Sequence, residues 1–153
     1  MDDIDHDARE RFPTKKEQVL NDFRKFSSAH LCLYSKSRNF DMGNPHANVS
    51  KLSPYLRRRL VSENEVLQIA LEKNSISSLE KFIQEIFWRT YWRGWLELRP
   101  DVYKDYENGY DGSNLPDKTG IKCFDHWTEE LKETGYLHNH ARMWYASIWI
   151  FTL

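Results

Sequence analysis

The chain has 153 residues, 29% of them charged, and its formal net charge at neutral pH is −1. This length fits one compact domain, and the charge balance excludes binding to nucleic acid through a global positive charge, so any such contact needs a local basic patch. Two distant cysteines without a CxxC pair favour neither a zinc site nor a disulfide framework. The acidic N-terminus and the lack of an apolar run of about 18 residues predict a cytoplasmic protein with no signal peptide and no membrane contact.

Capping boxes, in which a serine or threonine precedes a glutamate by three residues, predict the starts of three helices. They lie at Thr14–Glu17, Ser62–Glu65 and Ser77–Glu80. The third precedes the longest periodic segment, about residues 78–98, which Arg99–Pro100 closes. We expect the apolar side chains that follow these starts to face the core: Val19, Leu20, Phe23, Phe26, Val66, Leu67, Ile69, Phe82, Ile83, Ile86 and Phe87.

Three segments lack helical periodicity. Residues 1–11 are acidic and are expected to be a flexible N-terminus, whereas residues 31–50 and 101–120 contain glycine, proline and asparagine and are predicted to be loops. Between them, Ser53–Pro54 is typical of an N-cap followed by proline in the first turn of a short helix.

Two further helices are predicted, over about residues 123–133 and 138–152. The last ends in the apolar run I-W-I-F-T-L at 148–153, and apolar side chains around most of a helix imply burial on all sides. We therefore expect the chain to stop within a domain. No alternating strand pattern is present, so the predicted class is all-α, with one bundle-like domain over residues 12–153.

The segment N-V-S-K-L-S-P at 48–54 combines two hydroxyls with a predicted helix start. Backbone N–H groups at such a start, together with Ser50, Ser53 and the cation of Lys51, suit a phosphate or diphosphate. A serine that merely caps its own helix is the alternative.

On the long predicted helix, four polar or aromatic residues share one face. Glu85, Trp88, Arg89 and Trp92 are spaced at i, i+3, i+4 and i+7, which suits a planar anionic ligand. A Glu–Arg surface pair beside core tryptophans is the alternative reading of the same spacing.

Near the C-terminus, Asn139, Arg142 and Met143 fall on one helical face. The neighbouring His138 and His140 are two residues apart, so their side chains diverge around a helix and do not chelate a metal together. No metal is predicted here.

These three segments, in this order, resemble the flavin domain of the DNA photolyase/cryptochrome family. The family pattern is (T/S)-S-R-L-S-P, then E-(L/I)-x-W-R on a long helix, then T-G-(W/Y)-x-H-N-R-x-R-M. Here the segments are V-S-K-L-S-P at 49–54, E-I-F-W-R at 85–89 and T-G-Y-L-H-N-H-A-R-M at 134–143. The resemblance covers about residues 34–153.

The resemblance implies the first part of an all-helical FAD-binding domain, and light-driven electron transfer from the reduced flavin that repairs pyrimidine dimers in DNA. It implies that the FAD diphosphate is held by Ser50, Lys51, Leu52, Ser53 and Arg89, with Tyr34 as a further phosphate contact. It places Glu85, Trp88 and Met143 at the dimer cavity, and Asn139 and Arg142 at the flavin ring.

Five departures from the family pattern are visible. Val49 replaces a hydroxyl residue, Lys51 and His140 each replace arginine, Thr90 stands where an acidic residue is common, and residues 119–125 lack the proline of T-G-x-P-x-V-D. The α/β antenna domain and the D-x-D and N-x-x-W-x-W region of the family are also missing, so a separate antenna domain or partner is possible.

Two other interpretations stay open: a cryptochrome-like flavin photoreceptor without repair activity, and a truncated helical remnant that binds neither flavin nor DNA. The basic run Arg57–Arg59 suits DNA phosphates, and a solvated arginine run is its alternative.

Overall fold

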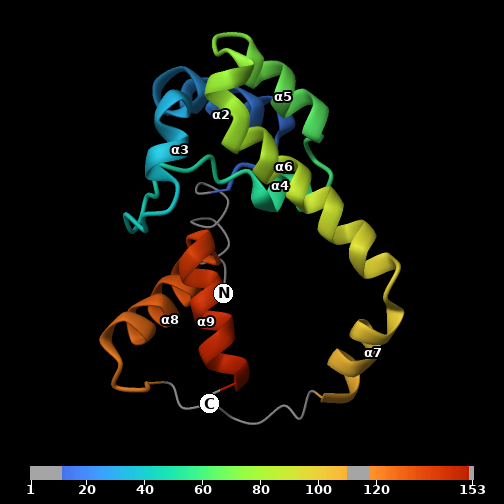
Figure 1. Cartoon of the computed structure of the whole chain (residues 1–153). Coiled ribbons are helices and arrows are strands. Elements are labelled where there is room, and N and C mark those ends of the chain that lie inside the picture. The colour runs from blue at the N-terminus through green and yellow to red at the C-terminus, as the bar shows by residue number, and fades with distance from the viewer. Residues whose placement is uncertain (1–11, 110–117, 152–153) are drawn as a thin grey trace.

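The computed structural model describes residues 12–109 and 118–151, and every regular element within these ranges is helical (Figure 1). This confirms the all-α class, while the expected flexible segment 1–11 lies outside the described residues. The elements are α2 (Lys16–His30), the 3₁₀ turn η1 (Leu31–Leu33), α3 (Tyr34–Ser37), α4 (Ser53–Arg57), α5 (Glu63–Leu71), α6 (Ile76–Glu97), α7 (Pro100–Gly109), α8 (Lys122–Thr134) and α9 (Asn139–Phe151).

The helices form two groups. Helices α2 to α5 pack around the first half of α6, and α6 then runs out of this group toward α7 (Figure 1). Helices α8 and α9 pack on each other through the stacked rings of Phe124 and Tyr145, whose centroids are 4.5 Å apart. The residue after α3 meets the residue before α9, where the Arg38 carbonyl lies 3.0 Å from Nε2 of His138.

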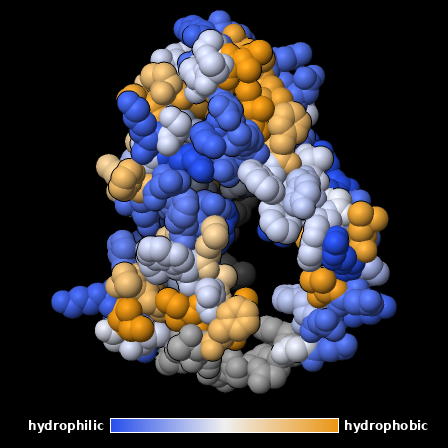
Figure 2. Space-filling model, viewed as in Figure 1, coloured by the Kyte–Doolittle hydropathy of each residue, from blue (hydrophilic) through white to orange (hydrophobic). Residues whose placement is uncertain are grey.

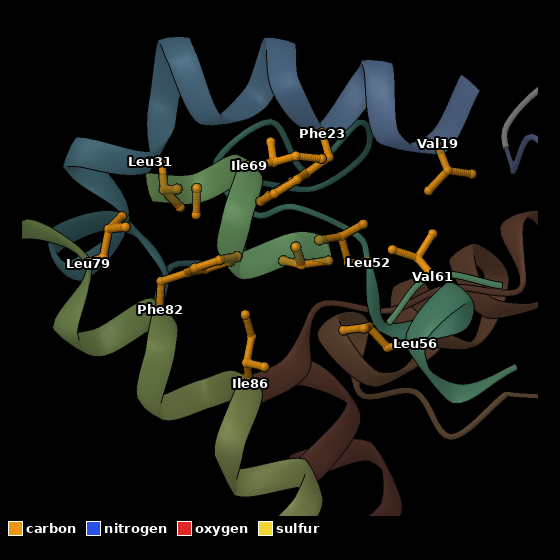
Figure 3. Close-up of a cluster of buried hydrophobic side chains, with 12 residues drawn as sticks. Val19, Phe23, Leu31, Leu52, Leu56, Val61, Ile69, Leu79, Phe82 and Ile86 are labelled. Carbon is orange, nitrogen blue, oxygen red and sulfur yellow. The ribbon is translucent and has the colours of Figure 1, made fainter. Parts of the chain in front are cut away.

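One apolar core holds the first group together (Figure 3). Phe23 from α2 and Phe82 from α6 extend into it, with their ring centroids 5.8 Å apart, and Tyr34 packs edge-on against Phe82. The predicted core positions that are buried are Val19, Phe23, Val66, Ile69, Phe82 and Ile86, and those partly buried are Leu20, Phe26, Leu67 and Ile83. Phe87 is the exception: it is 55% exposed, and no residue of α6 after Ile86 is buried.

The capping box at Ser62 is confirmed. The Ser62 hydroxyl accepts a hydrogen bond from the Glu65 N–H at 3.3 Å, and the Glu65 carboxylate accepts one from the Ser62 N–H at 3.0 Å. Lys16 on α2 lies 2.7 Å from the same carboxylate, so the cap also ties α2 to α5. Lys16 and the Ser62 bonds lower the pKa of Glu65 to about 2.

The other two predicted capping boxes are wrong. Helix α2 begins at Lys16 with Lys15 as its N-cap and no side-chain cap bond, so Thr14 does not cap it. Helix α6 begins at Ile76, where the Ser75 hydroxyl accepts from the Ser78 N–H, so the helix starts before Ser77 can act as its cap.

Two predicted loops and one predicted cap also need correction. Residues 31–37 continue as η1 and α3, because the glycine, proline and asparagine that indicated a loop cluster only after residue 38. The predicted loop 101–120 begins with a helix instead: Pro100 opens α7 (Pro100–Gly109), since proline fits the first turn of a helix, and residues 110–117 lie outside the described residues. Leu52, not Ser53, precedes α4, although Pro54 does lie in its first turn.

The two predicted C-terminal helices are confirmed as α8 and α9, and Gly135 ends α8 in the left-handed conformation at φ +67°. The described structure does not cover the apolar last helix on all sides: Trp144 and Ile150 are exposed, and Phe151 is 82% exposed. Apolar residues gather over α8 and α9 at the bottom of Figure 2. Among the helices described here, none has the length and apolar character that crossing a membrane requires.

Candidate cofactor pocket

A pocket of about 270 Å³ lies where α3, the loop before α4, α6 and the start of α9 meet. Most of the site residues predicted from the sequence line it: Tyr34, Ser50, Lys51, Leu52, Ser53, Glu85, Arg89, Asn139 and Arg142. Trp88 and Met143 do not line it, and they are 48% and 59% exposed. Three motifs that are far apart in the chain therefore meet in one cavity.

The loop that carries Ser50 and Lys51 is fixed from both ends. The amide of Asn48 donates hydrogen bonds to the carbonyls of Ser37 at 2.8 Å and Phe40 at 2.9 Å, which ties the loop to the end of α3. Leu52 is buried in the core and anchors the other end. Between them, Lys51 adopts φ +51°, a left-handed conformation that a lysine holds only when its surroundings enforce it.

Arg38 is a pocket residue that the sequence reasoning missed. Its guanidinium donates to the Glu85 carboxylate at 2.5 Å, so the charge of Glu85 is paired at the pocket wall. Its position in the Y-S-K-S-R-N segment, four residues after Tyr34, was the available signal. Three further cations line the pocket, at Lys51, Arg89 and Arg142, against no other carboxylate in its lining, so the cavity favours an anion.

Arg89 and Arg142 reach the pocket from two different helices, α6 and α9. Arg89 on α6 donates to the Leu56 carbonyl at 3.4 Å and lies 3.8 Å from the Glu63 carboxylate. Arg142 on α9 donates to the Asn139 side-chain oxygen at 3.0 Å. The amide of Asn139 also reaches the sulfur of Met143 at 3.9 Å, which confirms the predicted common face of the last helix.

His138, which precedes α9, connects this side of the pocket to the end of α3. It is fully buried, its Nε2 lies 3.0 Å from the Arg38 carbonyl, and its Nδ1 lies 3.3 Å from the His140 N–H. Because Nδ1 accepts from a backbone N–H, Nε2 carries the proton and donates to the carbonyl. Burial lowers the pKa of His138, which agrees with this neutral tautomer.

A second contact, between His46 and Glu130, connects the first group of helices to α8. His46, in the loop after α3, places its Nε2 2.5 Å from the Glu130 carboxylate of α8, and both side chains are buried. The His46 ring also packs edge-on against Tyr136, with the centroids 5.2 Å apart. A lone histidine in a loop and a glutamate within a helix carry no local signal for such a pair.

Tyr34 contributes a neutral hydroxyl to the pocket. Burial, and then the negative charge of Glu85, raise the pKa of Tyr34 to about 12. The phenol therefore stays protonated at neutral pH and is able to donate a hydrogen bond to an anion.

Metal chemistry has no visible site in the described part of the chain. Within residues 12–109 and 118–151, no cluster of three or more histidine, cysteine, aspartate or glutamate side chains could hold a metal ion.

Comparison with known proteins gives one consistent result. Each of the following relatives carries the name deoxyribodipyrimidine photo-lyase. The protein from Alkalihalophilus pseudofirmus is 26% identical over 145 residues, covering 86% of this chain and 30% of the relative. That from Streptomyces griseus is 32% identical over 114 residues, covering 68% and 25%. That from Vibrio cholerae is 24% identical over 148 residues, covering 86% and 31%.

The described part of the chain is therefore an all-helical domain, and by its sequence relatives the chain belongs to the DNA photolyase family. It spans only about a quarter to a third of the length of these curated relatives. No model of a protein family matches the chain, and no solved structure matches it.

Proposed function

We propose that residues 12–153 form an FAD-binding segment of a photolyase-like protein, and that the pocket holds the FAD diphosphate. The observation that carries the proposal is the convergence of three separate motifs on one cavity with four cations, Arg38, Lys51, Arg89 and Arg142, and the single carboxylate of Glu85. A diphosphate needs such charge, and serine hydroxyls and arginine forks bind its oxygens.

The size of the pocket fits part of the cofactor. Its volume of about 270 Å³ is just below the range of roughly 300–1,000 Å³ typical of small-molecule sites, so it suits a diphosphate with its flanking groups more than a whole dinucleotide. The Nδ1 atom of His140, which lines the pocket, is buried with no hydrogen-bond partner among the described residues. A bound ligand would supply that partner.

We assign the remaining motif residues to the flavin ring and to DNA. Asn139 and Arg142 would flank the ring, and Arg142 is already oriented by its bond to Asn139. Trp88 would stack on a pyrimidine dimer flipped out of the DNA, while Glu85 would accept a hydrogen bond from it and Met143 would close the cavity. The reduced flavin, when bound, would supply the electron that splits the dimer under light.

Binding of FAD tests this proposal directly. Protein purified in the dark is titrated with FAD, ADP and riboflavin, followed by flavin absorbance and, for ADP, by competition. We expect FAD and ADP to compete and riboflavin to bind more weakly, because the riboflavin lacks the diphosphate. Binding of riboflavin as tightly as FAD, or no binding of FAD by a chain whose circular dichroism shows it is folded, would refute the proposal.

Single substitutions identify the residues. Lys51→Ala and Arg142→Ala should each weaken FAD binding by about 10- to 150-fold, since a charge-assisted hydrogen bond is worth roughly 1.5–3 kcal/mol. Lys104→Ala is the matched control: this lysine is exposed on α7 and pairs with Asp101, outside the pocket. Blue-light cleavage of a thymine dimer by the FAD-loaded protein then separates repair from a photoreceptor role.

A further inference from the structure

The two groups of helices meet through a buried pair of ionisable side chains, His46 and Glu130, which we call the junction pair. Helices α8 and α9 form a separate pair beside the first group (Figure 1). His46, in the loop after α3, is 2% exposed, and Glu130 of α8 is 6% exposed. The Nε2 atom of His46 lies 2.5 Å from the carboxylate of Glu130. Hydrogen bonds with an ionised partner are the short and strong ones, so this contact joins the groups firmly.

His46 also fixes the loop that leads to Ser50 and Lys51. Its N–H donates to the Gly43 carbonyl at 2.7 Å, and its own carbonyl accepts from the Val49 N–H at 3.2 Å. These bonds hold His46 at φ +54°, in the left-handed region that glycine adopts much more readily. The junction pair therefore connects the base of the pocket loop to α8.

The surroundings of His46 favour a proton on each ring nitrogen. Nδ1, which is buried and makes no hydrogen bond among the described residues, lies 3.5 Å from the Asp41 carboxylate. A neutral imidazole beside two carboxylates would place its lone pair against one of them. An imidazolium, or a neutral imidazole beside a protonated Glu130, avoids this repulsion. Either state holds one proton more than a neutral histidine beside a carboxylate.

Two further titratable groups face His46, both from the segment between α8 and α9. Tyr136 meets the His46 ring edge-on with the centroids 5.2 Å apart, and His138 stacks on it at 6.2 Å. Burial raises the pKa of Tyr136 and lowers the pKa of His138, so both side chains are neutral near pH 7. The charge at this junction therefore depends on the extra proton of the junction pair and on Asp41.

We propose that the junction pair is a pH-sensitive switch, which holds α8 and α9 against the first group while it keeps its extra proton and releases them when it loses that proton. Loss of the proton leaves the Glu130 carboxylate buried beside a neutral ring, and a buried charge without a counter-charge is strongly destabilising. Separation of the two groups returns this carboxylate to water.

The same separation divides the pocket, because Asn139 and Arg142 belong to α9 whereas Lys51 belongs to the first group. The switch therefore regulates the pocket, and the inference rests on the proposed function only in treating that pocket as the cofactor site.

The direction of the pH response follows from the number of protons bound. The closed arrangement holds one proton more than the open one wherever a solvated histidine is neutral, which is above about pH 6.5. The ratio of closed to open molecules should therefore fall by up to about tenfold for each pH unit above that value. This response is opposite in sign to that of His138, which is buried in its neutral form.

The two cysteines allow a direct measurement. Both are exposed and they lie in different groups, Cys32 in η1 and Cys123 in α8. Nitroxide labels on both report the distribution of distances between them by pulsed electron paramagnetic resonance, without FAD, from pH 6.5 to pH 9. We expect a single narrow distribution at pH 6.5 and a second, broader population that grows with pH. One unchanged distribution over this range would overturn the proposal.

Substitutions assign the response to the junction pair. Glu130→Gln keeps an oxygen that accepts from Nε2 of His46 but removes the charge, so its distribution should stay narrow at every pH. Glu129→Gln is the matched control, because Glu129 is the exposed neighbour on α8 and its variant should respond as the parent does. His46→Gln, checked for folding by circular dichroism, should show the broad population already at pH 6.5. The same pH response in Glu130→Gln as in the parent would overturn the proposal.

Binding of ADP over the same pH range connects the switch to the pocket. The affinity should fall together with the closed population in the parent and stay constant in Glu130→Gln. The two proposals fail independently. A pH-dependent distance without any binding of ADP or FAD upholds the switch and refutes the cofactor proposal, whereas FAD binding with an unchanged distance does the reverse.

Discussion

Replacing Phe82 by alanine tests how the core supports the pocket. Phe82 is 4% exposed, stacks on Phe23 with centroids 5.8 Å apart, and packs edge-on against Tyr34 at 5.3 Å. Removing a buried phenylalanine costs about 3–5 kcal/mol through lost burial and the cavity left behind. We expect about 4 kcal/mol here, a large part of the 5–15 kcal/mol by which small domains are stable.

The assay is urea unfolding followed by circular dichroism, and Phe87→Ala is its matched control. Phe87 lies on the same helix, carries the same side chain and is 55% exposed, so its loss should change the free energy of unfolding by no more than about 0.5 kcal/mol. A cost for Phe82→Ala below about 1.5 kcal/mol, or equal costs for both variants, would refute the placement of the core. Because Phe82 also lines the pocket, its variant should bind FAD more weakly.

Two further predictions concern a helix cap and a buried histidine. Ser62→Ala should lower the free energy of unfolding by about 1 kcal/mol, while Ser77→Ala, which removes no N-cap, should have little effect; equal losses in urea unfolding would contradict the cap assignment. Burial lowers the pKa of His138, so at low pH the unfolded chain binds a proton at this residue that the folded chain does not bind. The free energy of unfolding should therefore fall as the pH drops below about 6.5. His138→Gln should reduce that pH dependence in thermal unfolding, and an unchanged profile would argue against the neutral, buried imidazole.

The helices were predictable because their apolar residues repeat at helical spacing, and this signal is local. Their starts were less so, because several serines compete for one cap. Ser75 lies two residues before Ser77, and its hydroxyl accepts the hydrogen bond from the Ser78 N–H. The helix therefore begins before Ser77, and the capping-box pattern at Ser77 does not mark a helix start. Pro100 shows the same ambiguity, since one residue both stops α6 and starts α7.

The site was predictable wherever its residues lie in motifs, and not where they act through distant partners. Ser50, Glu85 and Asn139 were found from their segments, and all three line the pocket. The bonds from Arg38 to Glu85 and from His138 to the Arg38 carbonyl join residues 47 and 100 positions apart. No spacing rule connects such residues, so only the folded structure reveals them.

These long-range bonds make the pocket depend on how the two groups of helices are held together. Glu85 and the loop that carries Ser50 and Lys51 belong to the first group, whereas Asn139 and Arg142 belong to α9. The His138 bond to the Arg38 carbonyl spans this junction, and Arg38 in turn holds Glu85. Two hydrogen bonds made by Arg38, one through its carbonyl and one through its guanidinium, thus connect the start of α9 to the middle of α6 along the lining of the proposed cofactor site. Loss of His138 should therefore displace pocket residues that belong to both groups of helices.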